Sequence, residues 1–251
     1  DLTPGGWDSP TFSLSGDRGY TFSPDGRELC YVSNHDPDQA SSTNADVWVV
    51  RLDEEGVEPV NLTADNKGWD GTPLYSPDGR FMAFRSQATP GYESDLFRLA
   101  VYDRESRSIR YLTDRANFDN WITEMQWFGD SGGLCFQAEY KGRNPLYRYR
   151  FDSGEIEPLL TDGTIGGWTL IGEQTEVLYS KRRVGSPPEI FRAPLGGGEP
   201  RRLTHFNAKL EEEVDIRPAE EIWVQGDGDY EVQVFLVKPH GFDPSKKYPL
   251  I

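Results

Sequence analysis

The residues with the most direct catalytic potential are Gly129-Asp130-Ser131-Gly132-Gly133, which match the G-x-S-x-G pattern of a hydrolase nucleophile. Such a serine needs a sharp turn between a strand and a helix, and a histidine to activate it. The residues that follow, Leu134-Cys135-Phe136, instead predict a second strand. The only upstream histidine, His35, lies in a polar loop. We therefore predict that Ser131 belongs to a structural turn and does no chemistry.

The same turn recurs along the chain. In Ser76-Pro77-Asp78-Gly79, proline presets φ, Ser and Asp can bond the turn backbone, and glycine suits the fourth position, as in a type I turn. Ser23-Pro24-Asp25-Gly26 repeats it, and Asp130 and Glu173 occupy the turn acid's place in two degenerate copies. The four turn acids are 53, 52 and 43 residues apart. Each turn lies between two apolar runs that predict strands.

Two further markers follow each turn in the same order. The first is an acidic residue or proline before two apolar residues: Asp46-Val47-Trp48, Asp95-Leu96-Phe97, Pro145-Leu146-Tyr147 and Glu189-Ile190-Phe191. The second is Leu-Thr at 62–63, 112–113, 160–161 and 203–204. Repeats of this length with several strands each are typical of a β-propeller. A β-sandwich with coincidental turns is the less favoured alternative.

We therefore predict an all-β fold with four blades of four antiparallel strands, within residues 1–206 and near 4–63, 64–113, 114–161 and 162–204. The second blade should have strands near 72–76, 81–86, 96–103 and 108–113. The opening Asp1-Leu2-Thr3 resembles a blade end, so we expect earlier blades to be missing and the propeller to be incomplete. Open sheet edges would favour self-association.

The region 207–251 lacks the propeller markers. Residues 207–213 are polar and acidic and predict a linker. Two alternating segments, Glu221–Gln225 and Glu231–Val237, then predict a β-hairpin. A turn-rich connector leads to Leu250-Ile251, which we expect to begin a strand of a truncated second domain. Gly196-Gly197-Gly198 lacks the continuation of a phosphate loop and predicts a hairpin connection within the fourth blade.

Composition excludes several classes of function. The formal net charge of −16 argues against nucleic acid as a partner, since phosphate binding needs a basic surface. No apolar run is long enough to span a membrane.

Residues His35, Asp36 and Asp38 do not have the spacing of a specific metal site, and no cofactor is predicted. Cys30 and Cys135 occupy equivalent places in two blades and are expected to be unpaired core residues. The compartment, cytoplasmic or periplasmic, stays open.

The repeats, the hairpin and the connector Lys238-Pro239-His240-Gly241-Phe242-Asp243-Pro244-Ser245-Lys246-Lys247-Tyr248-Pro249-Leu250 together resemble the prolyl oligopeptidase family of serine peptidases. The nearest branch is similar to the bacterial dipeptidyl and acylaminoacyl peptidases. Three segments carry that likeness: Arg85-Ser86 with Gly91–Asp95, Phe118–Trp121 and Pro187–Arg192. The resemblance covers essentially the whole chain, and the connector is its most specific part.

The resemblance implies a propeller that caps an α/β-hydrolase domain, where the catalytic Ser, Asp and His lie. None of that triad can be placed on this sequence, so we expect no activity from the chain alone and name no catalytic residue. The implied partners are short peptides and the hydrolase domain. A peptide's free amino terminus needs an acidic partner. Glu93 and Asp95 are the candidates, and Arg85 is a candidate for a carboxylate or carbonyl group.

Other interpretations stay open. Arg85, Glu93 and Asp95 could instead form a salt bridge that fixes their loop. The chain could also be a non-catalytic propeller that binds a protein partner, because fold does not determine function. The hydrolase-like hairpin and the Tyr-Pro-Leu segment favour the peptidase over this interaction module. A sugar-active propeller enzyme has no support, since the acids lie in turns and loops.

Overall fold

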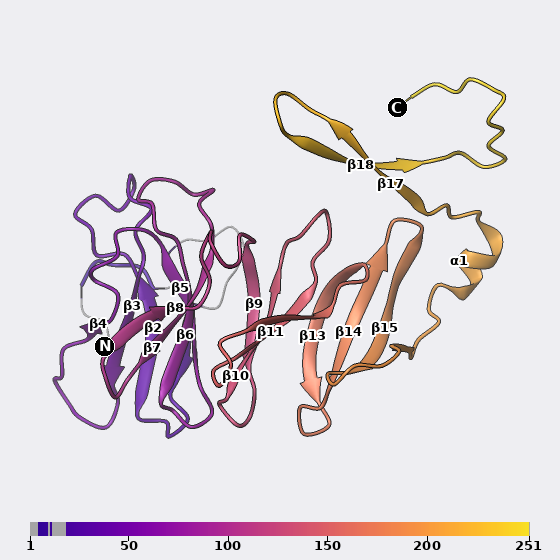
Figure 1. Cartoon of the computed structure of the whole chain (residues 1–251). Helices are drawn as coiled ribbons and strands as arrows, with labels where there is room; N and C mark the ends of the chain where they lie inside the picture. Colours follow the sequence, from indigo (N-terminus) through magenta and orange to yellow (C-terminus); the bar gives the residue numbers. More distant parts are fainter. Residues whose placement is uncertain (1–4, 10, 12–18, 251) are drawn as a thin grey trace. The chain divides into compact units, whose positions relative to one another are not determined.

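The computed structural model describes residues 5–9, 11 and 19–250 of the chain (Figure 1). Asp1-Leu2-Thr3, on which the expectation of a preceding blade rests, lie outside the described residues. The chain forms two compact units, one of Asp1–Glu139 with Leu146–Pro158 and one of Tyr140–Pro145 with Leu159–Ile251.

The first three blades are four-stranded antiparallel sheets in which each strand pairs with the next along the chain. The first sheet has β1 (Tyr20–Phe22), β2 (Glu28–Ser33), β3 (Asp46–Arg51) and β4 (Val60–Asn61). The second has β5 (Asp70–Tyr75), β6 (Phe81–Ser86), β7 (Arg98–Asp103) and β8 (Ser108–Tyr111). The third has β9 (Ile122–Trp127), β10 (Gly133–Ala138), β11 (Leu146–Arg150) and β12 (Ile156–Leu160). The predicted all-β blade architecture is confirmed.

The Ser-Pro-Asp-Gly turn forms as the residue types predict. The backbone N–H of Gly79 donates to Ser76 O at 2.8 Å, closing the turn. Ser76 Oγ donates to Asp78 Oδ1 at 2.6 Å and accepts from the N–H of Phe81 at 2.8 Å. Gly79 has φ 72°, a value that glycine tolerates without strain. These local bonds set where β5 ends and β6 begins.

The core lies between the sheets, because the middle strands bury both faces. In β6, Met82 and Phe84 join a cluster that contains Cys30, whereas the intervening Ala83 joins a cluster with Leu134. Neighbouring side chains of a strand point to opposite faces, so one strand serves both packing layers. Cys30 and Cys135 are free and buried, which confirms their predicted role.

The Leu-Thr marker has a structural reason. Thr63 Oγ1 accepts the backbone N–H of Val47 at 3.0 Å, and Thr113 Oγ1 accepts that of Leu99 at 2.7 Å. In the fourth blade, Thr204 Oγ1 accepts the N–H of Ile190 at 2.9 Å. Each threonine thus satisfies a backbone donor on the third strand of its blade.

The second unit holds the fourth blade, formed by β13 (Thr164–Ile171), β14 (Glu176–Arg183), β15 (Ser186–Pro194) and β16 (Arg201–Arg202). The three glycines 196–198 connect β15 to β16, as predicted. The separate β17 (Ala219–Gln225) and β18 (Glu231–Val237) pair as the predicted hairpin.

Residues 207–213, predicted as a linker, include a short helix that the residue pattern did not predict. They contain α1 (Ala208–Glu213), a six-residue helix with no buried residue. Lys209 Nζ lies 3.7 Å from Glu213 Oε1, a favourable pair one helical turn apart. The sequence signal for this helix is weak because it has no apolar stripe.

Among the described residues, no helix has the length and apolar character needed to cross a membrane.

Candidate functional site

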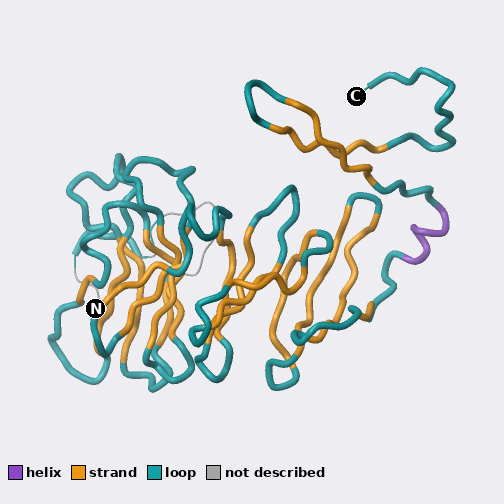
Figure 2. Tube along the Cα trace, in the orientation of Figure 1, coloured by secondary structure: helices purple, strands orange, loops and turns teal. Residues whose placement is uncertain are grey.

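The loops that follow β2 and β6 lie at the end of the first two sheets away from the Ser-Pro-Asp-Gly turns (Figure 2). They line a cavity of about 610 Å³. Polar groups and two aromatic rings line it. The lining residues are Asp8, Thr11, Asn34, Gln39, Ala40, Ser42, Thr43, Asn44, Ala45, Trp69, Gln87, Glu93 and Phe97. One of the three candidate residues from the sequence, Glu93, is among them.

Glu93 is exposed, and Gln87 fixes its backbone. Gln87 Nε2 donates to Glu93 O at 2.9 Å and to Asp95 O at 2.8 Å. Gln87 is itself 4% exposed, so this bond anchors the loop to the buried end of β6. Within the described residues, the Glu93 carboxylate forms no hydrogen bond or ion pair. It is therefore available to a ligand.

The aromatic wall of the cavity consists of Trp69 and Phe97. Their ring centroids are 5.2 Å apart at an interplanar angle of 77°, an edge-to-face contact. The Arg85 guanidinium lies 4.7 Å from the Phe97 centroid and 5.4 Å from that of Trp69. Arg85 is 7% exposed, and its Nε donates to Thr72 Oγ1 at 3.1 Å. Arg85 therefore supports the two rings by cation–π contact.

Asp95 is committed to its own loop. Its Oδ2 accepts the backbone N–H groups of Ala88 at 3.0 Å and Thr89 at 2.8 Å, and Oδ1 accepts that of Leu96 at 2.8 Å. Arg115 Nη2 lies 3.4 Å from Oδ1. Burial opposes ionisation of Asp95, but the backbone hydrogen bonds outweigh burial and lower its pKa. Asp95 is an ionised brace for residues 88–96, and it does not line the cavity.

The sequence marker placed Asp95 in register with Asp46, and this correspondence is wrong. Ser33 pairs with Asp46 in the first sheet, and the equivalent Ser86 pairs with Arg98 in the second. The structural counterpart of Asp46 is therefore Arg98, three residues beyond Asp95. Asp95 does fix its loop, but its ion pair is with Arg115, and the alternative of a salt bridge among Arg85, Glu93 and Asp95 is not found in the described residues.

The structure thus brings Glu93 and the Arg85-supported rings to one cavity and leaves Asp95 outside it. Sequence reasoning missed Asp8, Gln87 and Phe97 as lining residues. No local sequence signal marks Asp8, because it reaches the cavity through the tertiary fold.

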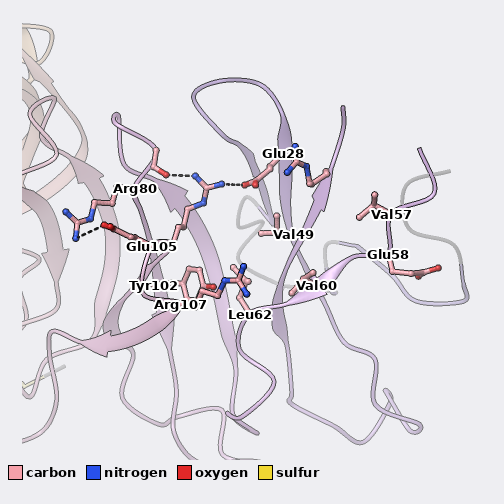
Figure 3. A pocket seen from close by; sticks show the side chains of 13 residues that line it. Glu28, Val49, Val57, Glu58, Val60, Leu62, Arg80, Tyr102, Glu105 and Arg107 are labelled. Atoms are coloured by element: carbon pink, nitrogen blue, oxygen red, sulfur yellow. Dashed lines mark hydrogen bonds and ion pairs between the residues drawn. The ribbon is translucent and has the colours of Figure 1, made fainter. Parts of the chain in front are cut away.

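A second cavity of about 610 Å³ lies between the first two sheets at the turn end (Figure 3). Arg104 lines it and donates to Gly79 O and to Glu28 Oε2, both at 2.5 Å. Arg80 pairs with Asp103 at 3.2 Å. The Arg104–Glu28 ion pair joins the second blade to the first, whereas the Arg80–Asp103 pair lies within the second blade. Among the described residues, no cluster of three or more His, Cys, Asp or Glu side chains could hold a metal ion.

The chain is similar to curated dipeptidyl peptidases. No family model matches the chain. The chain is 27% identical to dipeptidyl-peptidase 5 of Porphyromonas gingivalis over 98% of its own length and 35% of the relative. It is 29% identical to a probable dipeptidyl-peptidase 5 of Trichophyton verrucosum over 96% of its own length and 34% of that protein. The chain thus spans about a third of the length of these curated relatives.

A solved structure shares the fold. An acylaminoacyl peptidase in complex with Z-Gly-Gly-Phe-chloromethyl ketone matches 92% of this chain and 33% of its own, with a TM-score of 0.70 at 17% identity. The curated relatives confirm the resemblance found in the sequence, and the solved structure shows the same fold. Over nearly its whole length, the chain resembles the propeller region of peptidases of the prolyl oligopeptidase family.

Proposed function

We propose that this chain is the propeller part of a serine peptidase that acts on short peptides, and that it gates their access to a catalytic α/β-hydrolase domain. The similarity to dipeptidyl-peptidase 5 over nearly the whole chain supports the peptidase assignment. The reaction we propose is release of dipeptidyl, aminoacyl or acylaminoacyl groups. A propeller that covers a catalytic cleft would admit short peptides and exclude folded proteins.

One observation carries the proposed binding role: the free Glu93 carboxylate lies on the same cavity as Trp69 and Phe97. An ammonium group leaving water must be paired with an anion, and aromatic faces also attract cations. We propose that Glu93 binds the amino terminus of the peptide. Asp95 and Arg85 would act through Glu93 and the rings, because Asp95 braces the loop and Arg85 supports the wall.

Steady-state kinetics of the full-length protein with Glu93→Gln tests this role. We expect KM for dipeptide 4-nitroanilides with a free amino group to rise about tenfold, the equivalent of about 1.4 kcal/mol. Values for the N-acetylated substrates should not change. Glu155→Gln, at an exposed residue of the third blade, is the matched control. An unchanged KM in Glu93→Gln would remove Glu93 from the site.

The coding sequence beyond the codon for Ile251 tests the peptidase assignment itself. A G-x-S-x-G motif followed by an aspartate and then a histidine within a few hundred codons would support it. An immediate stop codon would instead favour the second candidate, a non-catalytic interaction propeller.

We also propose self-association through the first sheet. Tyr20 and Phe22 of the edge strand β1 are 56% and 55% exposed. Tyr75, the counterpart of Phe22 in the second blade, is only 6% exposed. Exposed apolar edges favour pairing with another chain. Light scattering on the full-length protein tests this, and a monomer would contradict it.

A further inference from the structure

The cavity between the first two sheets at the turn end has an apolar floor (Figure 3). Val49, Leu62 and Tyr102 line it, and all three pack against the buried cluster that contains Cys30. Val60 of β4 also lines it and is 58% exposed. Apolar surface is unfavourable in water, so this floor can accept an apolar group of a ligand.

One cation on this cavity is free. Four arginines line it, and three of them have anionic partners within the protein. The three ion pairs are Arg51–Asp53 at 2.9 Å, Arg80–Asp103 at 3.2 Å and Arg104–Glu28 at 2.5 Å. The fourth, Arg107, is exposed and has no ion pair, hydrogen bond or cation–π contact within the described residues. Its guanidinium is therefore available to an anion from outside the chain.

The backbone of Arg107 has a conformation that usually belongs to glycine. Arg107 lies in the connection between β7 and β8 with φ 55°. The connection between the third and fourth strands has Gly56 at φ 71° in the first blade and Gly154 at φ 71° in the third. A residue with a Cβ atom is less stable than glycine in this left-handed region. A long charged side chain kept in a strained position is typical of functional sites.

The neighbouring charges limit which anion Arg107 can bind. Glu58 also lines the cavity, is exposed, and has no cationic partner among the described residues (Figure 3). Its charge repels a multiply charged group such as a phosphate more strongly than a single carboxylate. One carboxylate can also accept two parallel hydrogen bonds from the planar guanidinium. The cavity therefore fits a carboxylate that is attached to an apolar group.

The strand β4 favours a peptide over a fatty acid as the source of that carboxylate. β4 pairs with β3 and is the outer strand of its sheet. An outer strand has backbone N–H and C=O groups that no neighbouring strand pairs. The main chain of a peptide can form hydrogen bonds with such groups, whereas a hydrocarbon tail cannot.

We propose that this cavity binds the carboxy-terminal residue of a peptide, with the carboxylate on Arg107 and an apolar side chain on Val60, Leu62 and Tyr102. The cavity shares no lining residue with the one that contains Glu93. The proposal goes beyond the proposed function and does not depend on it, because it concerns the opposite end of a peptide and a different cavity.

Calorimetric titration of the full-length protein with N-acetylphenylalanine and with its amide tests the proposal. Both probes lack an ammonium group, so their difference reports on the carboxylate alone. We expect wild type to bind the acid about tenfold tighter than the amide, and Arg107→Gln to remove that preference by weakening binding of the acid. Arg201→Gln, at an exposed residue of β16 that does not line the cavity, is the matched control.

Two further substitutions of Arg107 separate binding from folding. Glycine suits the positive φ, so Arg107→Gly should have a midpoint of urea denaturation at or above that of wild type while binding of the acid falls as in Arg107→Gln. Arg107→Lys keeps the charge without the planar fork and should restore binding only in part. A midpoint of Arg107→Gly below that of wild type would indicate a structural role for Arg107 and overturn the inference.

The remaining outcomes separate this proposal from its alternatives. A wild-type protein that does not prefer the acid, or unchanged binding in Arg107→Gln, would overturn the inference and leave the proposed function standing. Tighter binding of octanoate than of N-acetylphenylalanine would overturn the assignment to a peptide. Glu58→Gln removes a repulsive charge and should not weaken binding of the acid. Glu93→Gln should leave binding of both probes unchanged, since neither has an amino terminus.

Discussion

Ser131 and Asp78 join the turns of two neighbouring blades: the backbone N–H of Asp78 donates to Ser131 Oγ at 3.1 Å. Ser131 is 6% exposed and occupies the turn position that glycine has in the first two blades. Its φ of 57° is in the left-handed region, which is uncommon for a side chain other than glycine. The serine of the apparent nucleophile motif is thus a turn residue that packs against the preceding blade.

Replacement of Ser131 separates these two features. Ser131→Ala keeps the unfavourable φ and leaves the Asp78 N–H without its acceptor, so we expect a loss of about 1–3 kcal/mol in the free energy of unfolding. Ser131→Gly also loses the acceptor but relieves the backbone by about 1 kcal/mol. Urea denaturation should therefore rank wild type first, glycine second and alanine last. Peptidase activity of the full-length protein should survive both changes, and its abolition would restore the nucleophile hypothesis.

The Leu-Thr marker can be tested at Thr113, which is 1% exposed. Thr113→Val keeps the shape but removes the acceptor for the Leu99 N–H, which is buried in the second blade. An unsatisfied buried donor costs about 1–3 kcal/mol, so the midpoint of urea denaturation should fall accordingly. Thr113→Ser retains the hydroxyl and should lose less. Equal midpoints for the valine variant and wild type would contradict this role.

Asp70 should make stability depend on pH. It is fully buried, and burial raises its pKa to about 7, with Asp46 contributing and Ser86, Asn66 and Thr63 opposing. The unfolded chain releases this proton near pH 4, whereas the folded chain keeps it until about pH 7. Stability from this group therefore falls as pH rises from about 4 to 7, by at most about 4 kcal/mol, and is constant above that range.

Asp70→Asn should remove this effect. We expect the variant to gain stability over wild type at pH 8 and to gain little at pH 4.5, in urea denaturation at both values. Asp65→Asn, at an exposed site, is the control. Parallel pH dependences for wild type and Asp70→Asn would show that Asp70 ionises at an ordinary pKa in the folded protein.

The blade elements were predictable because their causes are local. The four strands expected near 72–76, 81–86, 96–103 and 108–113 are found as β5 to β8, with ends that differ by at most two residues. Turn chemistry and the alternation of side chains act over a few residues, so sequence alone carries them. The helix at Ala208–Glu213 escaped prediction because no buried face imposes a pattern on it.

The repeat, the blade architecture, the hairpin and the family resemblance could all be predicted from the order of the residues. Which acids are free depends on contacts that form only when the chain folds. Asp95 and Glu93 look alike in sequence, but backbone donors and Arg115 occupy Asp95, whereas Glu93 faces a cavity with Asp8. The physical reason is that the availability of a carboxylate depends on burial and on donors that folding brings from distant segments, and neither quantity has a local signature in the sequence.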